Sequence, residues 1–357
     1  MVSQTAQQFA TTGRPSAANR AIAAWLFTMA AMILIMVSIG GITRLTGSGL
    51  SIVEWRPLMG FFPPLSDAEW ARIFNLYQTS PQYQEVNTGI TLAGFKAIFW
   101  WEWAHRFWGR LIGIAFFLPF LWFLLRRKIE LSLAPRLLVL FILGGAQGVL
   151  GWYMVQSGLV DIPEVSQYRL AAHLMAALVL YVALLWTALQ LRHPVPETTP
   201  DRRLSGIRTL AITTLVLVTV TILSGAFVAG TDAGLAYNTF PLMDGSLVPA
   251  GYLPQPWYTS AFEDIATIQF HHRVLAIVSL IVAIATWWRS RWIVLVQRAR
   301  RVANGLLIIV CLQVTLGIST LIFAVPVPLA AAHQAGAVFL LTATLWLIYE
   351  LRTPKRA

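Results

Sequence analysis

Histidine is the residue type whose placement in this sequence points most directly to chemistry. Four of the six histidines recur in two matched sets. His105 corresponds to His272, each followed by an arginine, and His173 corresponds to His333, each preceded by two alanines. An imidazole in an apolar environment is costly without a partner, and neutral imidazole is the commonest metal ligand in proteins. The pattern therefore predicts two sites, each holding one metal between two histidines.

The chain around these histidines has the composition of a membrane protein. It has 357 residues, of which 57% are hydrophobic and 11% are charged. Apolar stretches of about 20 residues, the length that crosses a bilayer, recur along the whole sequence. The sequence predicts an all-α integral membrane protein with eight transmembrane helices, at 21–43, 97–125, 137–155, 170–191, 209–230, 265–288, 302–324 and 329–350.

Haem iron is the metal that we expect at both sites, because paired histidines inside a bilayer suit a haem. The four histidines lie roughly 6–12 Å below the same membrane boundary, at ~1.5 Å per helical residue. Adjacent helical residues point about 100° apart, so only one of His271 and His272 can face a site. We expect His272, since it aligns with His105. A structural or proton-relay role for single histidines is the alternative, which the matched pairs disfavour.

Basic residues are concentrated on one side of the predicted spans. If successive connections alternate sides, 18 of the 26 basic residues lie on the side that holds both termini, and 11 of the 15 acidic residues lie on the other. The positive-inside rule places the basic side in the cytoplasm. The histidines then lie toward the extracytoplasmic side. The net charge of +11 reflects this topology and does not indicate nucleic-acid binding.

The matched histidines belong to a longer internal repeat. The segment 40–50 resembles 225–235, and 147–151 resembles 313–317. Four crossings per half give both halves the same orientation, which predicts pseudo-two-fold symmetry about the membrane normal. The expected organisation is a cytoplasmic tail (1–20), an N-terminal four-helix half (21–191), a cytoplasmic linker (192–208), a C-terminal four-helix half (209–350) and a second cytoplasmic tail (351–357).

Three further features carry structural expectations. The long outer loops 44–96 and 231–264 are expected to hold interfacial helices that cap the sites, for example at 67–78. Cys311, the only cysteine, is expected to be a small buried residue in the seventh span. His193 lies outside the histidine pattern and is expected to be a solvated residue of the linker.

The two halves differ three residues before the first histidine of each, where Glu102 stands opposite Gln269. This spacing places each side chain on the histidine's face of its helix. A carboxylate at this depth is expected to be protonated or paired, and glutamine keeps its shape without transferring a proton. The sequence predicts a reactive N-terminal site, with Glu102 as the catalytic candidate, and an electron-transfer or structural haem in the C-terminal half. The alternative is that Glu102 only pairs with Arg106.

Three arginines accompany the first histidines. Arg106, Arg110 and Arg273 lie directly after them or one turn further on. Guanidinium groups pair well with carboxylates, so these residues are candidates for contact with haem propionates or for capping the sites. Snorkelling toward lipid head groups is the alternative.

Together these residues resemble the haem A synthase family. The resemblance is carried by Glu102, His105 and Arg106, the Gly-Gly-x-Thr-Arg stretch at 40–44, the two Ala-Ala-His motifs and the duplicated four-helix halves. It covers essentially the whole chain. Some members carry a cysteine pair in the first outer loop. This chain lacks that pair, like the proteobacterial and mitochondrial subgroup.

The resemblance implies an enzyme that oxidises the C8 methyl group of haem O to a formyl group, giving haem A for cytochrome c oxidase. It assigns Glu102, His105 and His173 to the substrate haem and His272 and His333 to a haem b. It also implies a bacterial inner-membrane location with the sites near the periplasm. Haem O synthase and cytochrome c oxidase assembly factors are the implied partners.

Two other functions fit parts of the pattern. A dihaem b-type cytochrome in quinol electron transfer would share the histidine pairs, but it would usually place haems on both sides of the membrane. A pseudo-symmetric transporter would use histidine and glutamate as a proton relay and bind no haem. The sequence leaves open the electron acceptor, the source of the formyl oxygen, release of a substrate-site histidine and the existence of a homo-oligomer.

Overall fold

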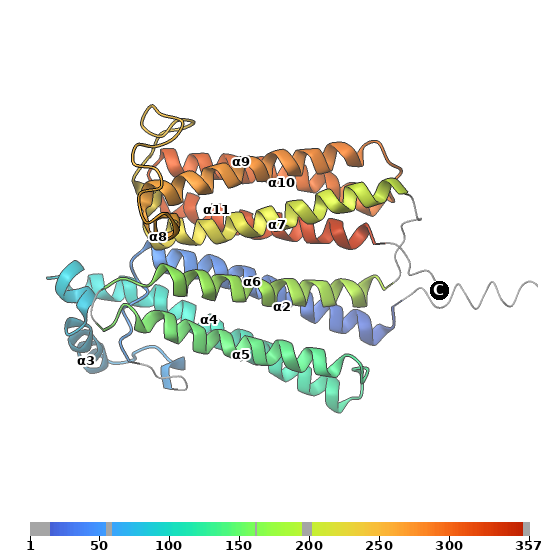
Figure 1. The fold of residues 1–357 in the computed structure, drawn as a ribbon. Helices are drawn as coiled ribbons and strands as arrows, with labels where there is room; N and C mark the ends of the chain where they lie inside the picture. Colours follow the sequence, from blue (N-terminus) through green and yellow to red (C-terminus); the bar gives the residue numbers. More distant parts are fainter. Residues whose placement is uncertain (1–14, 55–58, 161–162, 195–201, 353–357) are drawn as a thin grey trace, which may run out of the picture.

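The computed structural model of the chain describes residues 15–54, 59–160, 163–194 and 202–352. In these segments eight helices are long and apolar enough to cross a membrane (Figure 1), which confirms the predicted all-α membrane fold. They are α2 (Ala17–Leu45), α4 (Leu92–Leu125), α5 (Ala134–Gln156), α6 (Gln167–Arg192), α7 (Arg202–Gly230), α9 (Ile265–Ser290), α10 (Gln297–Ile322) and α11 (Val327–Glu350).

Side-chain caps fix where several helices begin. The Thr91 side chain accepts a hydrogen bond from the Gly94 amide at 3.2 Å, so α4 starts five residues before the predicted span. Helix α7 begins at Arg202 and takes up part of the segment expected as a linker. The rest of that linker at 195–201, the tail residues 1–14 and 353–357, and loop residues 55–58 and 161–162 lie outside the described residues.

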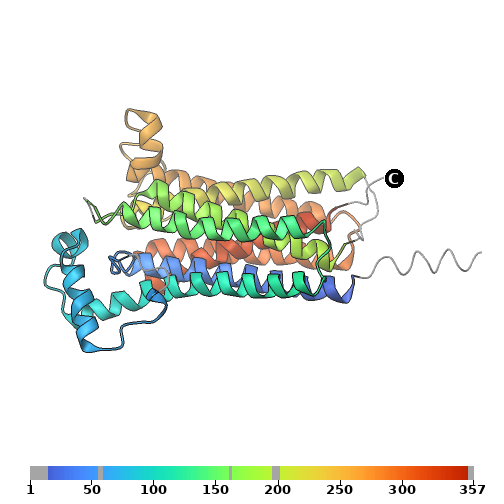
Figure 2. The ribbon, with the colours of Figure 1, turned by 90° about the horizontal axis from the view of Figure 1, so that it is seen from below.

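The two long outer loops lie at the same end of the helices (Figures 1 and 2). The first contains α3 (Asp67–Gln78), which confirms the helix predicted at 67–78. Its N-cap is Ser66, and Asp67 and Glu69 in the first turn complement the helix dipole. The other short elements of these loops are η1 (Met59–Phe61), η2 (Gln82–Val86), η3 (Ala233–Leu235) and α8 (Trp257–Glu263).

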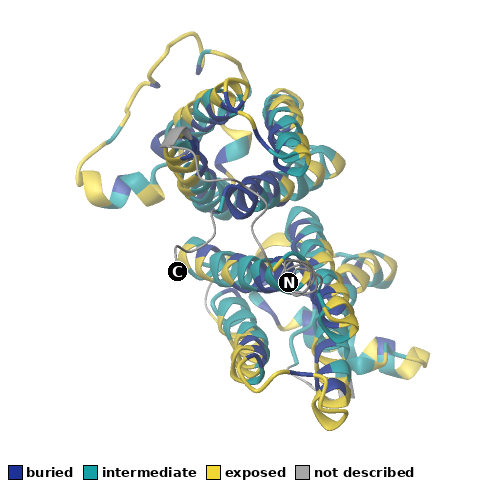
Figure 3. Ribbon diagram, turned by 90° about the vertical axis from the view of Figure 1, so that its right-hand side faces the viewer, coloured by how far each residue is buried: buried dark blue, intermediate teal, exposed yellow. Residues whose placement is uncertain are grey.

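The membrane helices form two groups of four, seen along their axes in Figure 3. Helices α2, α4, α5 and α6 form the N-terminal group, and α7, α9, α10 and α11 form the C-terminal group. Between the groups, α2 packs against α11 and α6 packs against α7. Each contact joins the first helix of one half to the last helix of the other, as a two-fold axis parallel to the helices requires. An ion pair of 3.1 Å between Arg44 and Asp232 links the halves at the outer end.

The core of the protein follows this interface. Leu26 of α2, Leu189 of α6 and Leu347 of α11 are completely buried. Helix α5 lies at the periphery and exposes apolar side chains such as Val149. Burial of the shared interface helices and exposure of apolar residues on the outer helices are expected when lipid covers the outside of the bundle.

Two expectations about single residues were wrong. Cys311 is exposed, because it shares the outward face of α10 with Ile308 and Leu312. His193 is partly buried, not freely solvated. Its Nδ1 atom lies 3.0 Å from the Arg298 guanidinium, and the Tyr349 hydroxyl donates to its backbone carbonyl at 2.7 Å.

Candidate functional site

The structure brings the four matched histidines together in two pairs. His105 on α4 and His173 on α6 lie close enough to interact electrostatically, as do His272 on α9 and His333 on α11. The Nε2 atom of His271 instead lies 3.1 Å from a tyrosine hydroxyl in the second outer loop. His272 and not His271 is therefore the neighbour of His333, and each half contains one histidine pair.

Both pairs lie toward the end of the helices that carries the outer loops. His173, His272 and His333 stand six, seven and six residues after the first residues of their helices. His105 stands thirteen residues after the start of α4, because α4 projects further into the loop region. At ~1.5 Å per residue, His173, His272 and His333 lie roughly 9–11 Å below their helix starts. The two sites are thus side by side and not stacked across the membrane.

Glycines on the neighbouring helices make room for the two imidazoles of the N-terminal pair. A Cβ atom on Gly40 of α2 would lie 3.3 Å from Nε2 of His105. A Cβ atom on Gly151 of α5 would lie 3.1 Å from Cε1 of His173. Each ring therefore packs against backbone where a side chain would push it away.

The C-terminal pair is cradled in the same manner. A Cβ atom on Gly225 would lie 3.1 Å from Cε1 of His272, and one on Gly317 would lie 2.8 Å from Cε1 of His333. These glycines occupy the same repeat positions as Gly40 and Gly151. The repeat matched them in the sequence, but their contact with the histidine rings could not be inferred from spacing alone.

A glutamine holds the second histidine of each pair. Gln313 donates from Nε2 to the His333 carbonyl at 2.9 Å, and the same atom lies 3.2 Å from His333 Nδ1. Gln147, in the amide orientation that satisfies both its nitrogen and its oxygen, reaches His173 Nδ1 at 3.1 Å and the His173 carbonyl at 3.2 Å. The two glutamines thus contact equivalent histidines through the same two atoms, the carbonyl oxygen and Nδ1.

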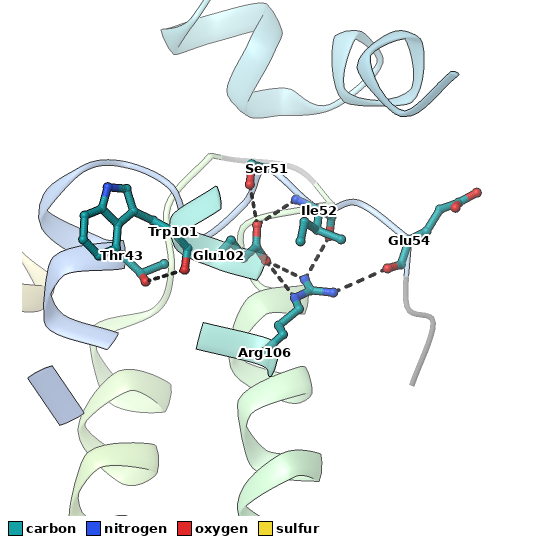
Figure 4. Close-up of polar contacts among 7 residues, drawn as sticks. All are labelled: Thr43, Ser51, Ile52, Glu54, Trp101, Glu102 and Arg106. Atoms are coloured by element: carbon teal, nitrogen blue, oxygen red, sulfur yellow. Dashed lines mark hydrogen bonds and ion pairs between the residues drawn. The ribbon is translucent and has the colours of Figure 1, made fainter. Parts of the chain in front are cut away.

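Glu102 is buried and engaged by four hydrogen bonds (Figure 4). Its Oε2 atom accepts from the Ser51 hydroxyl at 2.8 Å and from the Ile52 amide at 2.7 Å. Its Oε1 atom accepts from Nε of Arg106 at 3.0 Å and from Nη2 of the same guanidinium. The expected pairing with Arg106 is therefore present, together with an anchor to the first outer loop.

Gln269 occupies the equivalent position in the C-terminal half with different chemistry. Its amide nitrogen donates to the Ala233 carbonyl at 2.6 Å, and its oxygen accepts from Arg273 at 2.8 Å. The amide has only one oxygen, and Nε of Arg273 is buried without a partner among the described residues. Both halves thus tie this helix to the outer loop, but only the N-terminal half buries a carboxylate there.

The three candidate arginines hold the outer loops against the helices. Arg106 donates to the Ile52 carbonyl at 2.9 Å, and Arg110 donates to the Gly60 carbonyl at 2.9 Å. Arg273 donates to the Tyr237 and Thr239 carbonyls at 2.7 and 2.8 Å. These contacts correspond to the capping role considered for them, and contact with propionates stays a prediction.

A cavity of about 430 Å³ lies between α4, α3 and the first outer loop. Its lining includes Arg106, Arg110 and Arg72. The carboxylates of Glu69 and Glu54, which accept hydrogen bonds from the guanidinium, raise the pKa of Arg72 above its ordinary value. The cavity therefore combines largely apolar walls with three guanidinium groups, at the outer end of the N-terminal half beside the Glu102 network.

The residues present fit a haem between the two histidines of each pair. The glycines leave the rings free of a neighbouring Cβ, and Gln147 and Gln313 contact the second histidine of each pair. Among the described residues, no group of three or more His, Cys, Asp or Glu side chains is arranged to hold a metal ion. A pair of imidazoles suits a haem, because the macrocycle supplies the remaining four nitrogen ligands.

Fold and site together define a duplicated four-helix membrane protein with one paired-histidine site in each half. A family described as cytochrome oxidase assembly protein matches residues 23–345. Heme A synthases from Nitrosospira multiformis and Parvibaculum lavamentivorans are 49% and 47% identical to the chain, covering 96% and 95% of it and 96% of each relative. Heme A synthase from Granulibacter bethesdensis is 51% identical and covers 95% of the chain and 89% of the relative. The chain belongs to the haem A synthase family.

Proposed function

We propose that this chain is an oxidoreductase that converts haem O to haem A by oxidising the C8 methyl group to a formyl group, for use in cytochrome c oxidase. Relatives named heme A synthase match nearly its whole length. The observation that carries the proposal is a duplicated pair of histidine sites with a buried carboxylate three residues before the first histidine of only one of them. Such an arrangement supplies two similar sites for haem and a chemical difference between them.

The N-terminal pair, His105 and His173, holds the substrate haem, and the C-terminal pair, His272 and His333, holds a haem b. The assignment is supported by the position of Glu102 beside the first pair and of neutral Gln269 beside the second. Haem b, when bound, supplies one-electron transfer next to the substrate. The protein contributes the ligands, their orientation and the exclusion of water.

Glu102 provides a fixed negative charge at the substrate site. Its two oxygens accept hydrogen bonds from Ser51, Ile52 and Arg106, so the side chain is held in one position and paired with a guanidinium group. A carboxylate in this state is suited to stabilising positive charge that develops on the substrate. Proton transfer through Oε2, which accepts from the Ser51 hydroxyl, is the other role open to it.

The protein resides in the bacterial inner membrane with both termini in the cytoplasm and the histidine pairs toward the periplasm. This orientation rests on the concentration of basic residues at the end of the bundle opposite the histidines. Haem O, made by a haem O synthase, enters from the membrane, and haem A leaves toward cytochrome c oxidase assembly factors. Arg106, Arg110 and Arg273 stay candidates for contact with the propionates.

Pigment analysis tests the proposed function against its alternatives. Haem extracted from the purified protein is identified by mass and by its reduced pyridine spectrum. Haem b together with haem O or haem A supports the synthase, whereas haem b alone favours a dihaem cytochrome and absence of haem favours a transporter. The histidine pairs lie at one end of the bundle, which disfavours the cytochrome, because electron transfer across the membrane needs haems at both ends.

A further inference from the structure

The first histidine of the C-terminal pair has a hydroxyl partner. Nδ1 of His272 lies 2.8 Å from Oγ of Ser224 on α7. Oγ of Ser224 donates its single hydrogen to the Thr221 carbonyl at 2.9 Å. With the hydroxyl hydrogen on the Thr221 carbonyl, Oγ accepts from His272, and Nδ1 then carries the proton while Nε2 presents a lone pair. This is the tautomer that a histidine needs in order to bind iron through Nε2.

The N-terminal half lacks this partner. The repeat that aligns Gly40 with Gly225 places Ile39 opposite Ser224 and Met36 opposite Thr221. Neither residue has a hydroxyl group. Within the part of the chain that the structure describes, the His105 ring has no hydrogen-bond partner. Its contact with α2 is steric, through the Gly40 backbone.

This difference is confined to one ligand of each pair. Gln147 and Gln313 hold the second histidines in matching ways, and glycines cradle all four rings. A hydrogen bond from the outer nitrogen of a ligand histidine fixes its tautomer and orientation and makes it a stronger donor to the metal. Loss of such a partner typically weakens metal binding by about 10- to 100-fold.

We propose that Ser224 is a positioning residue that makes the C-terminal site retain its haem, and that Ile39 leaves His105 as the ligand that is released when haem enters or leaves the N-terminal site. The inference rests on the proposed function, which requires one resident haem and one haem exchanged in every turnover. Ser224 accounts for retention of haem in the C-terminal site. Ile39, the apolar residue at the equivalent position, accounts for exchange of haem in the N-terminal site.

Haem transfer to excess apomyoglobin measures retention without reference to activity. Ser224→Ala should release haem b about 10-fold faster than the unaltered protein, and Ser224→Thr, which keeps a hydroxyl, should release it at nearly the original rate. The reduction potential of haem b should rise in Ser224→Ala, because a weaker donor stabilises ferric iron less. Equal release rates and potentials in Ser224→Ala and the unaltered protein would overturn the proposal.

A reciprocal pair of variants tests the N-terminal site. Ile39→Thr introduces a hydroxyl, and Ile39→Val is its control of nearly equal shape. With haem O bound, Ile39→Thr should release it several-fold more slowly than Ile39→Val, and equal rates would overturn the proposal.

His272→Ala distinguishes failure of the proposed ligand assignment from failure of the role given to Ser224. If it keeps its haem b, the ligand assignment itself fails. If it loses haem b while both Ser224 variants match the unaltered protein, only the role of Ser224 fails.

Discussion

Gly317 on α10 packs its backbone against the imidazole ring of His333 on α11 so closely that a Cβ atom would lie 2.8 Å from Cε1. The same relationship joins a glycine to each of the other three matched histidines, at distances of 3.1 to 3.3 Å. The absence of a side chain at these four glycines therefore determines where the histidine rings lie in both halves. A side chain at any of these glycines must move the ring or the helix.

Gly317→Ala should therefore lower the haem b content of the purified protein several-fold. The added methyl group displaces His333 from its position, at a cost of about 1–3 kcal/mol for overpacking. Haem b is measured per polypeptide from the reduced pyridine spectrum. Gly305→Ala, on the same helix with open space around its Cβ position, is the matched control and should keep full haem b. Equal haem content in the two variants would contradict the steric account.

Gly41 should prove intolerant of alanine for a different reason. Its backbone touches the Gln334 side chain, which crosses from α11 and donates to the Val37 carbonyl at 3.0 Å. Gly41→Ala should reduce the stability of the α2–α11 contact by about 1–3 kcal/mol, seen as a lower melting temperature in detergent. The repeat places Ala226 and Leu174 at the equivalent positions, within an apolar cluster.

The double variant Gly41→Ala with Gln334→Leu copies that apolar pair. It should recover most of the lost stability, because the alanine methyl group then meets an apolar side chain. A double-mutant cycle measures the coupling between the two positions. Strictly additive effects would show that the two residues do not act on one another.

Glu102→Gln should abolish formation of haem A while leaving haem b in place. The substitution keeps the shape of the side chain but removes the negative charge and leaves Arg106 partly uncompensated. Haem A produced from added haem O is measured by mass. Ser51→Ala is the control, since it removes one hydrogen bond of about 0.5–1.5 kcal/mol and keeps the charge. Undiminished conversion by Glu102→Gln would refute the role given to this residue.

Much of the fold could be predicted from the sequence, because each span is a long apolar stretch bounded by polar or capping residues. Helix α3 was predictable because the loop is too long to lack structure and Ser66, Asp67 and Glu69 mark a helix start. Hydropathy does not distinguish a lipid-facing side from a protein-facing side when a helix is apolar all round. Cys311 was assigned to the wrong environment for that reason.

The histidine pairs could be predicted because the repeat copies them, but their surroundings depend on contacts between distant segments. The partners of Glu102 at Ser51 and Ile52 lie about fifty residues earlier, in an irregular loop without periodicity. Ser224 on α7 meets His272 on α9 only because the two helices pack together. A hydroxyl present in one half and missing in the other was visible in the repeat, but its meaning required the structure.

The central claim is that the two histidine pairs hold different haems. Its most direct test is the haem composition of His105→Ala and His272→Ala, purified from cells that make haem O, with His271→Ala as the control. His272→Ala should lose haem b, His105→Ala should keep haem b but lose haem O and haem A, and His271→Ala should match the unaltered protein. Loss of the same haem from both His105→Ala and His272→Ala would contradict the account.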